Sequence, residues 1–187
     1  LVAGGTGFVG TKVVHALRAA ELPVRVLARK PEKQDQLRAW GCEIVQGDLT
    51  DPDSLRRAAE GCDTVVHLVA ILLGSPEAFE RIMVQGTRDL VEAAKGAGVK
   101  RVVLMSALGT SEANRELVPY YRAKWDMEQA ALASSLEHVI FRPSFVFGSD
   151  GATATAPIEA TGSFSKIPVK VPPLLDDFAT PPLANPT

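Results

Sequence analysis

The chain has 187 residues, of which 46% are apolar and 22% charged, so it is long enough to form one globular domain with a sizeable core. With 20 Lys and Arg against 22 Asp and Glu, it lacks the basic excess typical of nucleic-acid binding. No apolar run reaches the roughly 18–20 residues of a membrane span, and no basic start leads into an apolar signal core. We therefore expect a cytoplasmic protein with no membrane span and no nucleic-acid partner.

The first ten residues contain a glycine-rich turn. An apolar start leads through glycines at positions 4, 5, 7 and 10 into a helix predicted over Val9–Ala20. A strand that turns tightly into a helix places the helix's free N–H groups and positive dipole end beside the turn. Glycines let an anion such as a dinucleotide pyrophosphate come close to that backbone. The pattern predicts a nucleotide site, although glycines can also serve only to make the turn tight.

Short apolar runs and helical patterns then alternate along the chain. Strands are predicted at Val24–Leu27, Glu43–Gln46, Thr64–Leu68, Arg101–Met105 and Val139–Phe141. Helices are predicted at Glu32–Trp40, Pro52–Ala59, Phe79–Ala97 and Pro119–Ser134. Gly41, Gly61 and Gly98 follow the first three and are expected to terminate them. Asp51 caps the second of these helices, and Pro52 occupies its first position. The alternation predicts an α/β fold with a doubly wound parallel sheet and a ligand at the carboxyl ends of its strands.

The segment after the second strand bears on the choice of dinucleotide. An acid at that point binds the free 2′-hydroxyl of NAD, whereas a basic residue accommodates the 2′-phosphate of NADP. Here the strand leads into Arg29 and Lys30, with no acid along this segment until Glu32. We favour NADP, with NAD still possible, although both basic side chains could simply be solvated. Asp48, after the third strand, could contact adenine or start the following turn.

Six phrases of the sequence together resemble the short-chain dehydrogenase/reductase superfamily. They are Gly4–Gly10 (GGTGFVG), Gly47–Asp51 (GDLTD), His67–Ala70 (HLVA), Val103–Gly109 (VLMSALG), Tyr120–Lys124 (YYRAK) and Phe141–Ser144 (FRPS). The resemblance is to the extended and atypical branches, which include epimerase/dehydratase-like proteins, NmrA-like proteins and relatives of the nucleotide-binding accessory subunit of complex I. It implies a Rossmann fold that binds NAD(P).

The resemblance also implies positions for the site residues. Together with the residues discussed above, the cofactor-binding set is Gly4, Thr6, Gly7, Phe8, Val9, Gly10, Arg29, Lys30, Asp48, Leu49, Val69, Ala70, Lys124 and Pro143. The catalytic set is Ser106, Tyr120 and Lys124, matching a Ser and a YxxxK motif. In active members the Tyr donates or accepts a proton, the Lys lowers the Tyr pKa and holds the nicotinamide ribose, and the Ser orients the substrate oxygen.

The spacing of Tyr120 and Lys124 agrees with that implication. Residues at i and i+4 share one face of a helix, so the ammonium can lie near the phenol. A nearby positive charge lowers the pKa of a tyrosine from its usual value near 10. The same spacing is also common in surface helices. Tyr121 has no lysine four residues on and is not a candidate.

Other residues that could bind metal or nucleobases are assigned structural roles. The histidines at 15, 67 and 138 match no ligand spacing, and Cys42 and Cys62 form no CxxC motif, so no metal site is predicted. We expect the cysteines to be reduced thiols in or near the core. Trp40 and Trp125 are predicted to pack rather than bind a base.

Two departures from the family pattern leave the function open. Met83 occupies a position where active members usually carry Asn, and residues 149–187 form an irregular, proline-rich segment in place of a substrate lobe. We therefore predict a nucleotide-binding domain over 1–148, followed by a truncated or disordered remnant of that lobe. The preferred function is an NADP(H)-dependent oxidoreductase or epimerase acting on an unknown small molecule. The alternative is a non-catalytic regulator or accessory subunit of a respiratory or photosynthetic complex. The family often forms dimers through the helices that hold Glu92 and Tyr120.

Overall fold

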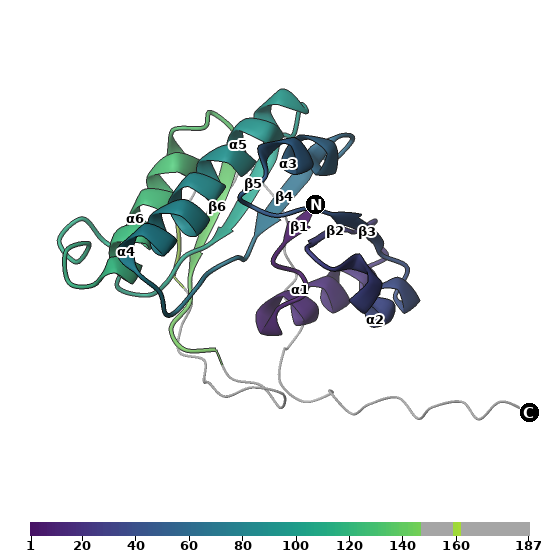
Figure 1. Cartoon of the computed structure of the whole chain (residues 1–187), viewed down its shortest axis with the longest axis horizontal. Helices are drawn as coiled ribbons and strands as arrows, with labels where there is room; N and C mark the ends of the chain where they lie inside the picture. Colours follow the sequence, from purple (N-terminus) through teal and green to yellow (C-terminus); the bar gives the residue numbers. More distant parts are fainter. Residues whose placement is uncertain (147–158, 162–187) are drawn as a thin grey trace, which may run out of the picture.

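A computed structural model describes residues 1–146 and 159–161, which form a twisted sheet between two layers of helices (Figure 1). Its described strands are β1 (Val2–Ala3), β2 (Arg25–Ala28), β3 (Glu43–Gln46), β4 (Thr64–His67), β5 (Arg101–Met105), β6 (Glu137–Arg142) and β7 (Glu159–Thr161). Their spatial order is β3-β2-β1-β4-β5-β6-β7, and β1 to β6 are all parallel. This confirms the predicted doubly wound sheet.

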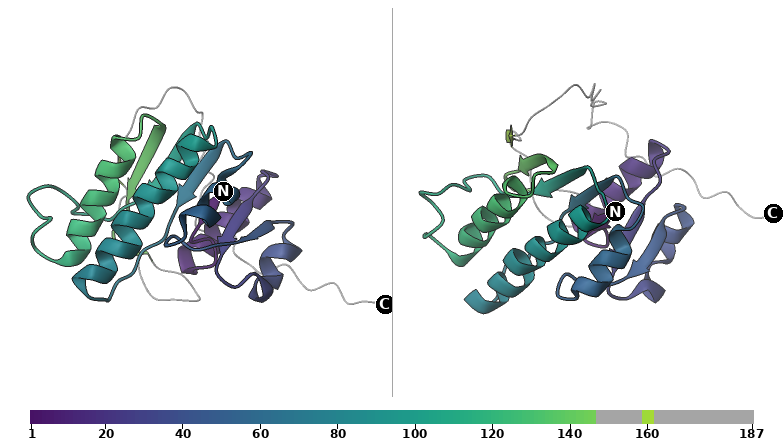
Figure 2. Two further views of the ribbon diagram at one scale, coloured as in Figure 1. Left: turned by 45° about the horizontal axis from the view of Figure 1, so that its top comes forward. Right: turned by 90° about the horizontal axis from the view of Figure 1, so that it is seen from above.

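Helices cover the sheet on both sides, as Figure 2 shows from two directions. They are α1 (Phe8–Ala19), α2 (Asp35–Ala39), α3 (Pro52–Ala59), α4 (Pro76–Ala78), α5 (Gly86–Gly96) and α6 (Pro119–Leu132), with a 3₁₀ turn η1 (Pro31–Lys33) and a π-helical turn η2 (Phe79–Gln85). α3, α5 and α6 lie together on one side, and α1 and α2 lie on the other.

The core lies between these layers. On the α1 and α2 side, Val14 and Leu37 pack against Val26 of β2. On the other side, Leu90 of α5 and Val102 of β5 belong to one buried cluster, and a second cluster joins η2 and α6 to β5 and β6. Because apolar side chains are needed on both faces, the central strands are nearly continuous apolar runs.

Local signals predicted most helix boundaries correctly. The side chain of Asp51 accepts hydrogen bonds from the backbone N–H groups of Asp53 and Ser54, and Pro52 opens α3. Gly41, Gly61 and Gly98 follow α2, α3 and α5 with φ of 77°, 71° and 75°, a left-handed conformation that side chains disfavour.

Two predicted helices and one unpredicted strand differ from expectation. The helix expected over 32–40 is a 3₁₀ turn followed by α2, because Gln34 leaves helical geometry at φ −111° and ψ 40°. The helix expected over 79–97 begins as the π-helical turn η2, which contains the buried Met83. β7 pairs antiparallel with β6 inside the segment 149–187, where no strand was predicted. The rest of that segment lies outside the described residues.

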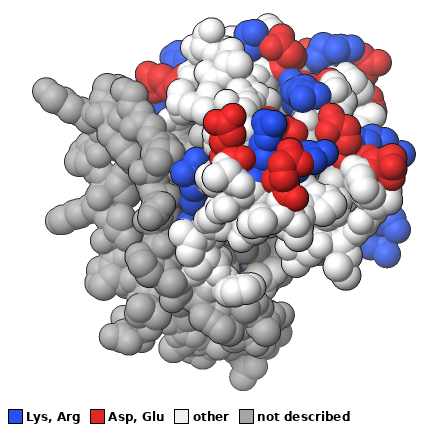
Figure 3. Space-filling model, turned by 90° about the vertical axis from the view of Figure 1, so that its left-hand side faces the viewer, with Lys and Arg blue, Asp and Glu red and all other residues white. Residues whose placement is uncertain are grey.

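Charges are interspersed on the side of the molecule shown in Figure 3, where basic and acidic side chains alternate without a large patch of one sign. Several described charges of opposite sign are paired, for example Arg122 with Glu116 and Lys95 with Glu92. None of the described helices is long and apolar enough to cross a membrane.

Candidate nucleotide and catalytic site

The glycine turn joins the carboxyl end of β1 to α1, where two of its glycines allow very close backbone contacts. Gly4 has φ +88°, and a Cβ there would lie 2.9 Å from the backbone nitrogen of Val69 after β4. A Cβ on Gly10 would lie 1.9 Å from the carbonyl oxygen of Gly4. Both positions therefore require glycine, and the turn brings two predicted cofactor segments together.

The amino end of α1 is suited to an anion. Gly7 is its N-cap and makes no side-chain cap, and no acidic residue lies in the first turn. Its first N–H groups therefore meet neither a capping oxygen nor a repelling carboxylate, unlike those of α3, which Asp51 caps. Thr6 and Gly7 are exposed, and Phe8 and Val9 are half-buried. The residues present thus fit a dinucleotide pyrophosphate.

The ends of β2 and β3 place a basic and an acidic side chain together. Arg29 and Lys30 are exposed, and Arg29 Nε lies 3.9 Å from Asp48 Oδ2. An acidic side chain, Asp48, therefore lies beside the predicted 2′-phosphate region. It comes from the end of β3, whereas the expectation from the sequence concerned only the segment after β2, which has no acid before Glu32. Asp48 also accepts hydrogen bonds from the backbone and hydroxyl of Thr50 at 2.9 and 2.8 Å, so it does start the following turn. A contact with adenine stays a prediction.

The other predicted cofactor positions differ in exposure. Leu49 is buried in the core beside Gly86, so its side chain is not exposed to a nucleotide, and a contact through its backbone stays a prediction. Val69 is half-buried and Ala70 exposed at the end of β4. Pro143 follows β6, and its carbonyl accepts a hydrogen bond from Leu108 N at 2.8 Å.

Lys124 connects the two elements that carry the predicted catalytic residues. It belongs to α6, is 1% exposed, and its Nζ donates a hydrogen bond to the carbonyl of Met105 at 2.7 Å. The next residue, Ser106, is buried with its Oγ 3.3 Å from Thr110 Oγ1. The same Nζ lies 5.8 Å from the centroid of the Tyr120 ring. Lys124 thus lies between the two other predicted catalytic residues, bonded to the neighbour of Ser106 and facing the ring of Tyr120.

The electrostatics of the Tyr–Lys pair differ from the expectation. Burial lowers the pKa of Lys124 to about 8, with Glu128 acting in the opposite direction. The pKa of Tyr120 is raised, chiefly by burial and secondly by Tyr121. The expected lowering of the Tyr120 pKa is therefore wrong for this arrangement, because the ammonium lies over the ring face and burial dominates.

His67, for which the sequence left a core or a surface role open, is buried at the carboxyl end of β4 and belongs to a polar chain that the sequence pattern did not reveal. The Thr87 hydroxyl donates its single proton to the carbonyl of Met83, so His67 Nε2 must donate to Thr87 Oγ1, 2.9 Å away. His67 Nδ1 is then an unprotonated acceptor without a protein partner. Burial and the charge of Lys124 lower the pKa of His67 to about 3.

This histidine is expected to make stability depend on pH. The folded protein keeps His67 neutral down to pH about 3, whereas the unfolded chain binds the proton near pH 6.5. The unfolded state takes up more protons in this window, so stability should fall by about 1.4 kcal/mol per pH unit as pH drops through it. Urea unfolding at several pH values should show a shallower pH dependence for His67→Leu than for the wild type. His15→Gln, which removes an exposed imidazole, is the control. Equal slopes for wild type and His67→Leu would contradict the expectation.

An ion pair between α6 and β6, with one member fully buried, was also missed. Glu128 is fully buried, and its two carboxylate oxygens accept hydrogen bonds from Arg142 Nε at 2.9 Å and Nη2 at 2.6 Å. The one available signal was helical spacing, because Tyr120, Lys124 and Glu128 are each four residues apart. Arg142 lies in the family phrase that pointed to Pro143, but its partner could not be deduced from the sequence.

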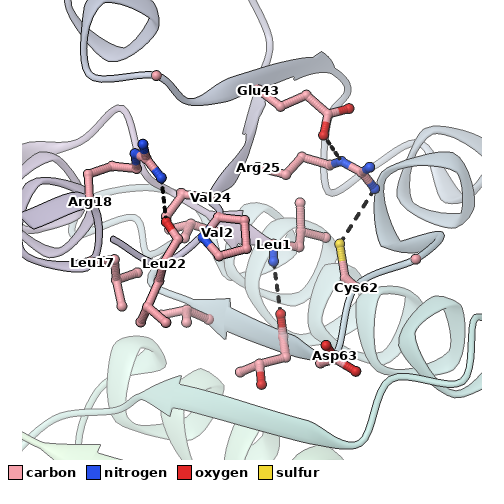
Figure 4. A pocket seen from close by; sticks show the side chains of 15 residues that line it. Leu1, Val2, Leu17, Arg18, Leu22, Val24, Arg25, Glu43, Cys62 and Asp63 are labelled. Carbon is pink, nitrogen blue, oxygen red and sulfur yellow. Dashed lines mark hydrogen bonds and ion pairs between the residues drawn. The ribbon is translucent and has the colours of Figure 1, made fainter. Parts of the chain in front are cut away.

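A separate pocket of about 500 Å³ opens at the opposite, amino end of the strands (Figure 4). Leu1, Val24 and Arg25 line it, and Arg25 Nε donates to Glu43 at 2.8 Å. The guanidinium also reaches Cys62 Sγ at 3.5 Å. Ligands of open α/β sheets bind at the carboxyl ends of the strands, so the pocket is not assigned to the cofactor.

Metal ligands and disulfides are absent from the described part of the chain. Cys42 is buried and Cys62 half-buried, and both are free thiols, as expected. Among residues 1–146 and 159–161, no three His, Cys, Asp or Glu residues gather into a group able to hold a metal ion.

The strand order, the glycine turn and the uncapped helix define a dinucleotide-binding protein of the Rossmann class. The model of the NAD(P)H-binding family matches residues 4–169. The chain therefore belongs to this NAD(P)H-binding family, whose solved structural relatives include members of the short-chain dehydrogenase/reductase superfamily. The family model matches beyond residue 148, so the end of the nucleotide-binding domain placed at that residue stays a prediction.

Individual relatives include both an enzyme and an assembly factor. The chain is 33% identical over 148 residues to ceramide reductase of Caulobacter vibrioides, covering 79% of this chain and 46% of the relative. It is also 33% identical over 147 residues to photosystem II assembly factor Ycf39 of Guillardia theta, with the same coverage of 79% and 46%. The chain thus spans about half the length of these curated relatives.

A solved structure supports the fold and the cofactor. A short-chain dehydrogenase/reductase superfamily protein from Agrobacterium tumefaciens with bound NAD is 32% identical. It superposes with a TM-score of 0.63, covering 75% of this chain and 47% of that one.

Proposed function

We propose that this chain carries the nucleotide-binding and proton-transfer half of an NADP(H)-dependent oxidoreductase or epimerase that acts on a small carbonyl compound. The observation that supports it best is the position of Lys124, whose ammonium lies over Tyr120 and is bonded to the residue before Ser106. Catalytic side chains of this architecture belong at the carboxyl ends of strands, and Met105, which Lys124 contacts, is the last residue of β5.

The cofactor would supply hydride when bound, and each of the three side chains would have a separate role. Tyr120 would donate a proton to the substrate oxygen, and its raised pKa keeps it in the protonated form needed for carbonyl reduction. Lys124 would hold the nicotinamide ribose and stabilise negative charge that develops on the Tyr120 oxygen. Ser106 would orient the substrate oxygen by a hydrogen bond.

The test is binding and oxidation of NADPH by the purified chain with a panel of carbonyl compounds. The panel should include bulky apolar ones, because the loops after β4, β5 and β6 expose Leu73, Leu117 and Phe145 by 91%, 67% and 75%. We expect calorimetry to detect NADPH binding and absorbance to detect its oxidation with at least one compound. Failure to bind NADPH or NADH would contradict the proposal.

The preference for NADP rests on Arg29, which is 82% exposed at the end of β2 and would have to pair with the 2′-phosphate beside its present partner Asp48. Arg29→Ala should weaken NADPH binding about tenfold or more while changing NADH binding little, because only NADPH has a 2′-phosphate to pair with the guanidinium. Calorimetry with both nucleotides measures this. Lys33→Ala, which removes an exposed charge at the end of η1, is the matched control. Equal losses for the two nucleotides would rule out the assignment.

A non-catalytic role is the second candidate, supported by Met83. This side chain is fully buried where active members usually carry Asn, so it fills space and cannot relay a proton. The equal identity to a reductase and to an assembly factor favours neither role. A regulator or accessory subunit would bind NADPH without turning over any compound of the panel.

Location and assembly belong to the same proposal. We expect a cytoplasmic protein whose partner is a small molecule rather than nucleic acid. A homodimer through α5 and α6, or a place in a larger complex, is the expected assembly; sedimentation of the purified chain would distinguish these from a monomer.

A further inference from the structure

The buried ammonium of Lys124 requires a counter-charge. Removing a charge from water is costly unless it is paired, and the hydrogen bond that Lys124 Nζ donates goes to an uncharged carbonyl. Tyr120 and Glu128 lie at i−4 and i+4 from Lys124 on the same face of α6, and both Lys124 and Glu128 are fully buried. His67 faces Lys124 from β4. Arg142, at the end of β6, brings a positive charge to Glu128. His67 is neutral, and the raised pKa of Tyr120 keeps that phenol neutral too. Among these, only Glu128 supplies negative charge.

Glu128 is held in place by Arg142. The two side chains meet through two parallel hydrogen bonds, a geometry in which the guanidinium keeps the carboxylate ionised and fixes its orientation. Arg142 is the last residue of β6 and directly precedes Pro143. The pair therefore ties α6, which carries Tyr120 and Lys124, to the strand end that carries another predicted cofactor residue.

We propose that Glu128, fixed by Arg142, is a positioning residue that keeps Lys124 protonated and α6 anchored beside the carboxyl end of β6. The effect on catalysis rests on the proposed function, whereas the effect on Lys124 itself does not. A purely structural ion pair would stabilise the fold without governing the protonation of Lys124.

The direct test is NMR titration of the full chain with ¹³C-labelled lysine, in the absence of nucleotide. The Lys124 signal is identified by its loss in Lys124→Arg. In Glu128→Gln, Lys124 should titrate about one pH unit or more below its wild-type midpoint, because an opposite charge has been removed. Asp126→Asn is the matched control, since a residue at i+2 does not share the face of Lys124. An unchanged Lys124 midpoint in folded Glu128→Gln would overturn the proposal.

Glu128→Gln leaves Arg142 without its carboxylate and could fail to fold, so a second variant keeps the test decisive. Replacing both members of a buried pair is often well tolerated, and Glu128→Gln with Arg142→Met should still lower the Lys124 midpoint. Glu128→Asp, which keeps the charge, should restore it toward the wild-type value. A wild-type midpoint in the double variant would also overturn the proposal.

A second readout connects the pair to activity. If the wild type oxidises NADPH, the alkaline loss of kcat in Glu128→Gln should move to lower pH by the same interval as the Lys124 midpoint. Movement of the NMR midpoint without movement of the pH profile would overturn the link to catalysis. If the wild type binds no nucleotide, the proposed function fails, but the NMR titration still decides the role of Glu128.

Discussion

Gly10→Ala is expected to abolish NAD(P)H binding and to destabilise the fold. The new methyl group would lie 1.9 Å from the Gly4 carbonyl oxygen and 2.7 Å from the Gly5 Cα, both of which are backbone atoms. Relief of the clash must move either the glycine turn or α1, and the Gly4 carbonyl also accepts the hydrogen bond from Gly7 N at 3.1 Å. Overpacking of this kind costs about 1–3 kcal/mol. Calorimetry with NADPH and urea unfolding measure the two effects.

Gly96→Ala is the matched control. Gly96 is the last residue of α5, and a Cβ there meets no heavy atom within 4 Å. The same added methyl group should therefore leave NADPH affinity unchanged and should raise stability by up to about 1 kcal/mol, because alanine favours the helix. Wild-type NADPH affinity in Gly10→Ala would show that the turn does not hold the nucleotide.

Tyr120→Phe is expected to remove turnover and leave NADPH affinity nearly unchanged. The substitution deletes only the hydroxyl, while the ring contacts with Phe79 and Tyr121 can persist at centroid distances of 6.4 and 6.0 Å. Loss of a positioned proton donor typically costs about 10²–10⁴-fold in rate. Steady-state kinetics with the most active compound of the carbonyl panel, combined with calorimetry, separates the rate effect from binding.

Tyr121→Phe provides the control within the same motif. It removes an identical hydroxyl one residue away, from a side chain that is not at i−4 from Lys124, so turnover should be retained. Retained turnover in Tyr120→Phe would remove Tyr120 from the mechanism. Absence of turnover in the wild type, with NADPH binding intact, would favour the non-catalytic role suggested by Met83.

The features that the sequence alone determined are those set by local chemistry. The apolar runs and helical patterns predicted the doubly wound sheet, and the glycine turn was evident because close backbone approach excludes a Cβ at Gly4 and Gly10. Asp51 with Pro52, and the glycines that follow α2, α3 and α5, marked helix ends because capping and positive φ depend on a few adjacent residues.

The tertiary structure decided the charges and contacts of the site. Asp48 lies beside Arg29 because β2 and β3 are neighbours. An acidic and a basic side chain therefore both lie near the end of β2, so the residue type there does not by itself distinguish NAD from NADP. Burial of Lys124 and Tyr120 outweighs their helical spacing in setting the Tyr120 pKa. Glu128 finds Arg142 only when α6 packs on β6. Local pattern determines which backbone forms, whereas desolvation and pairing of charges depend on segments that meet only after folding.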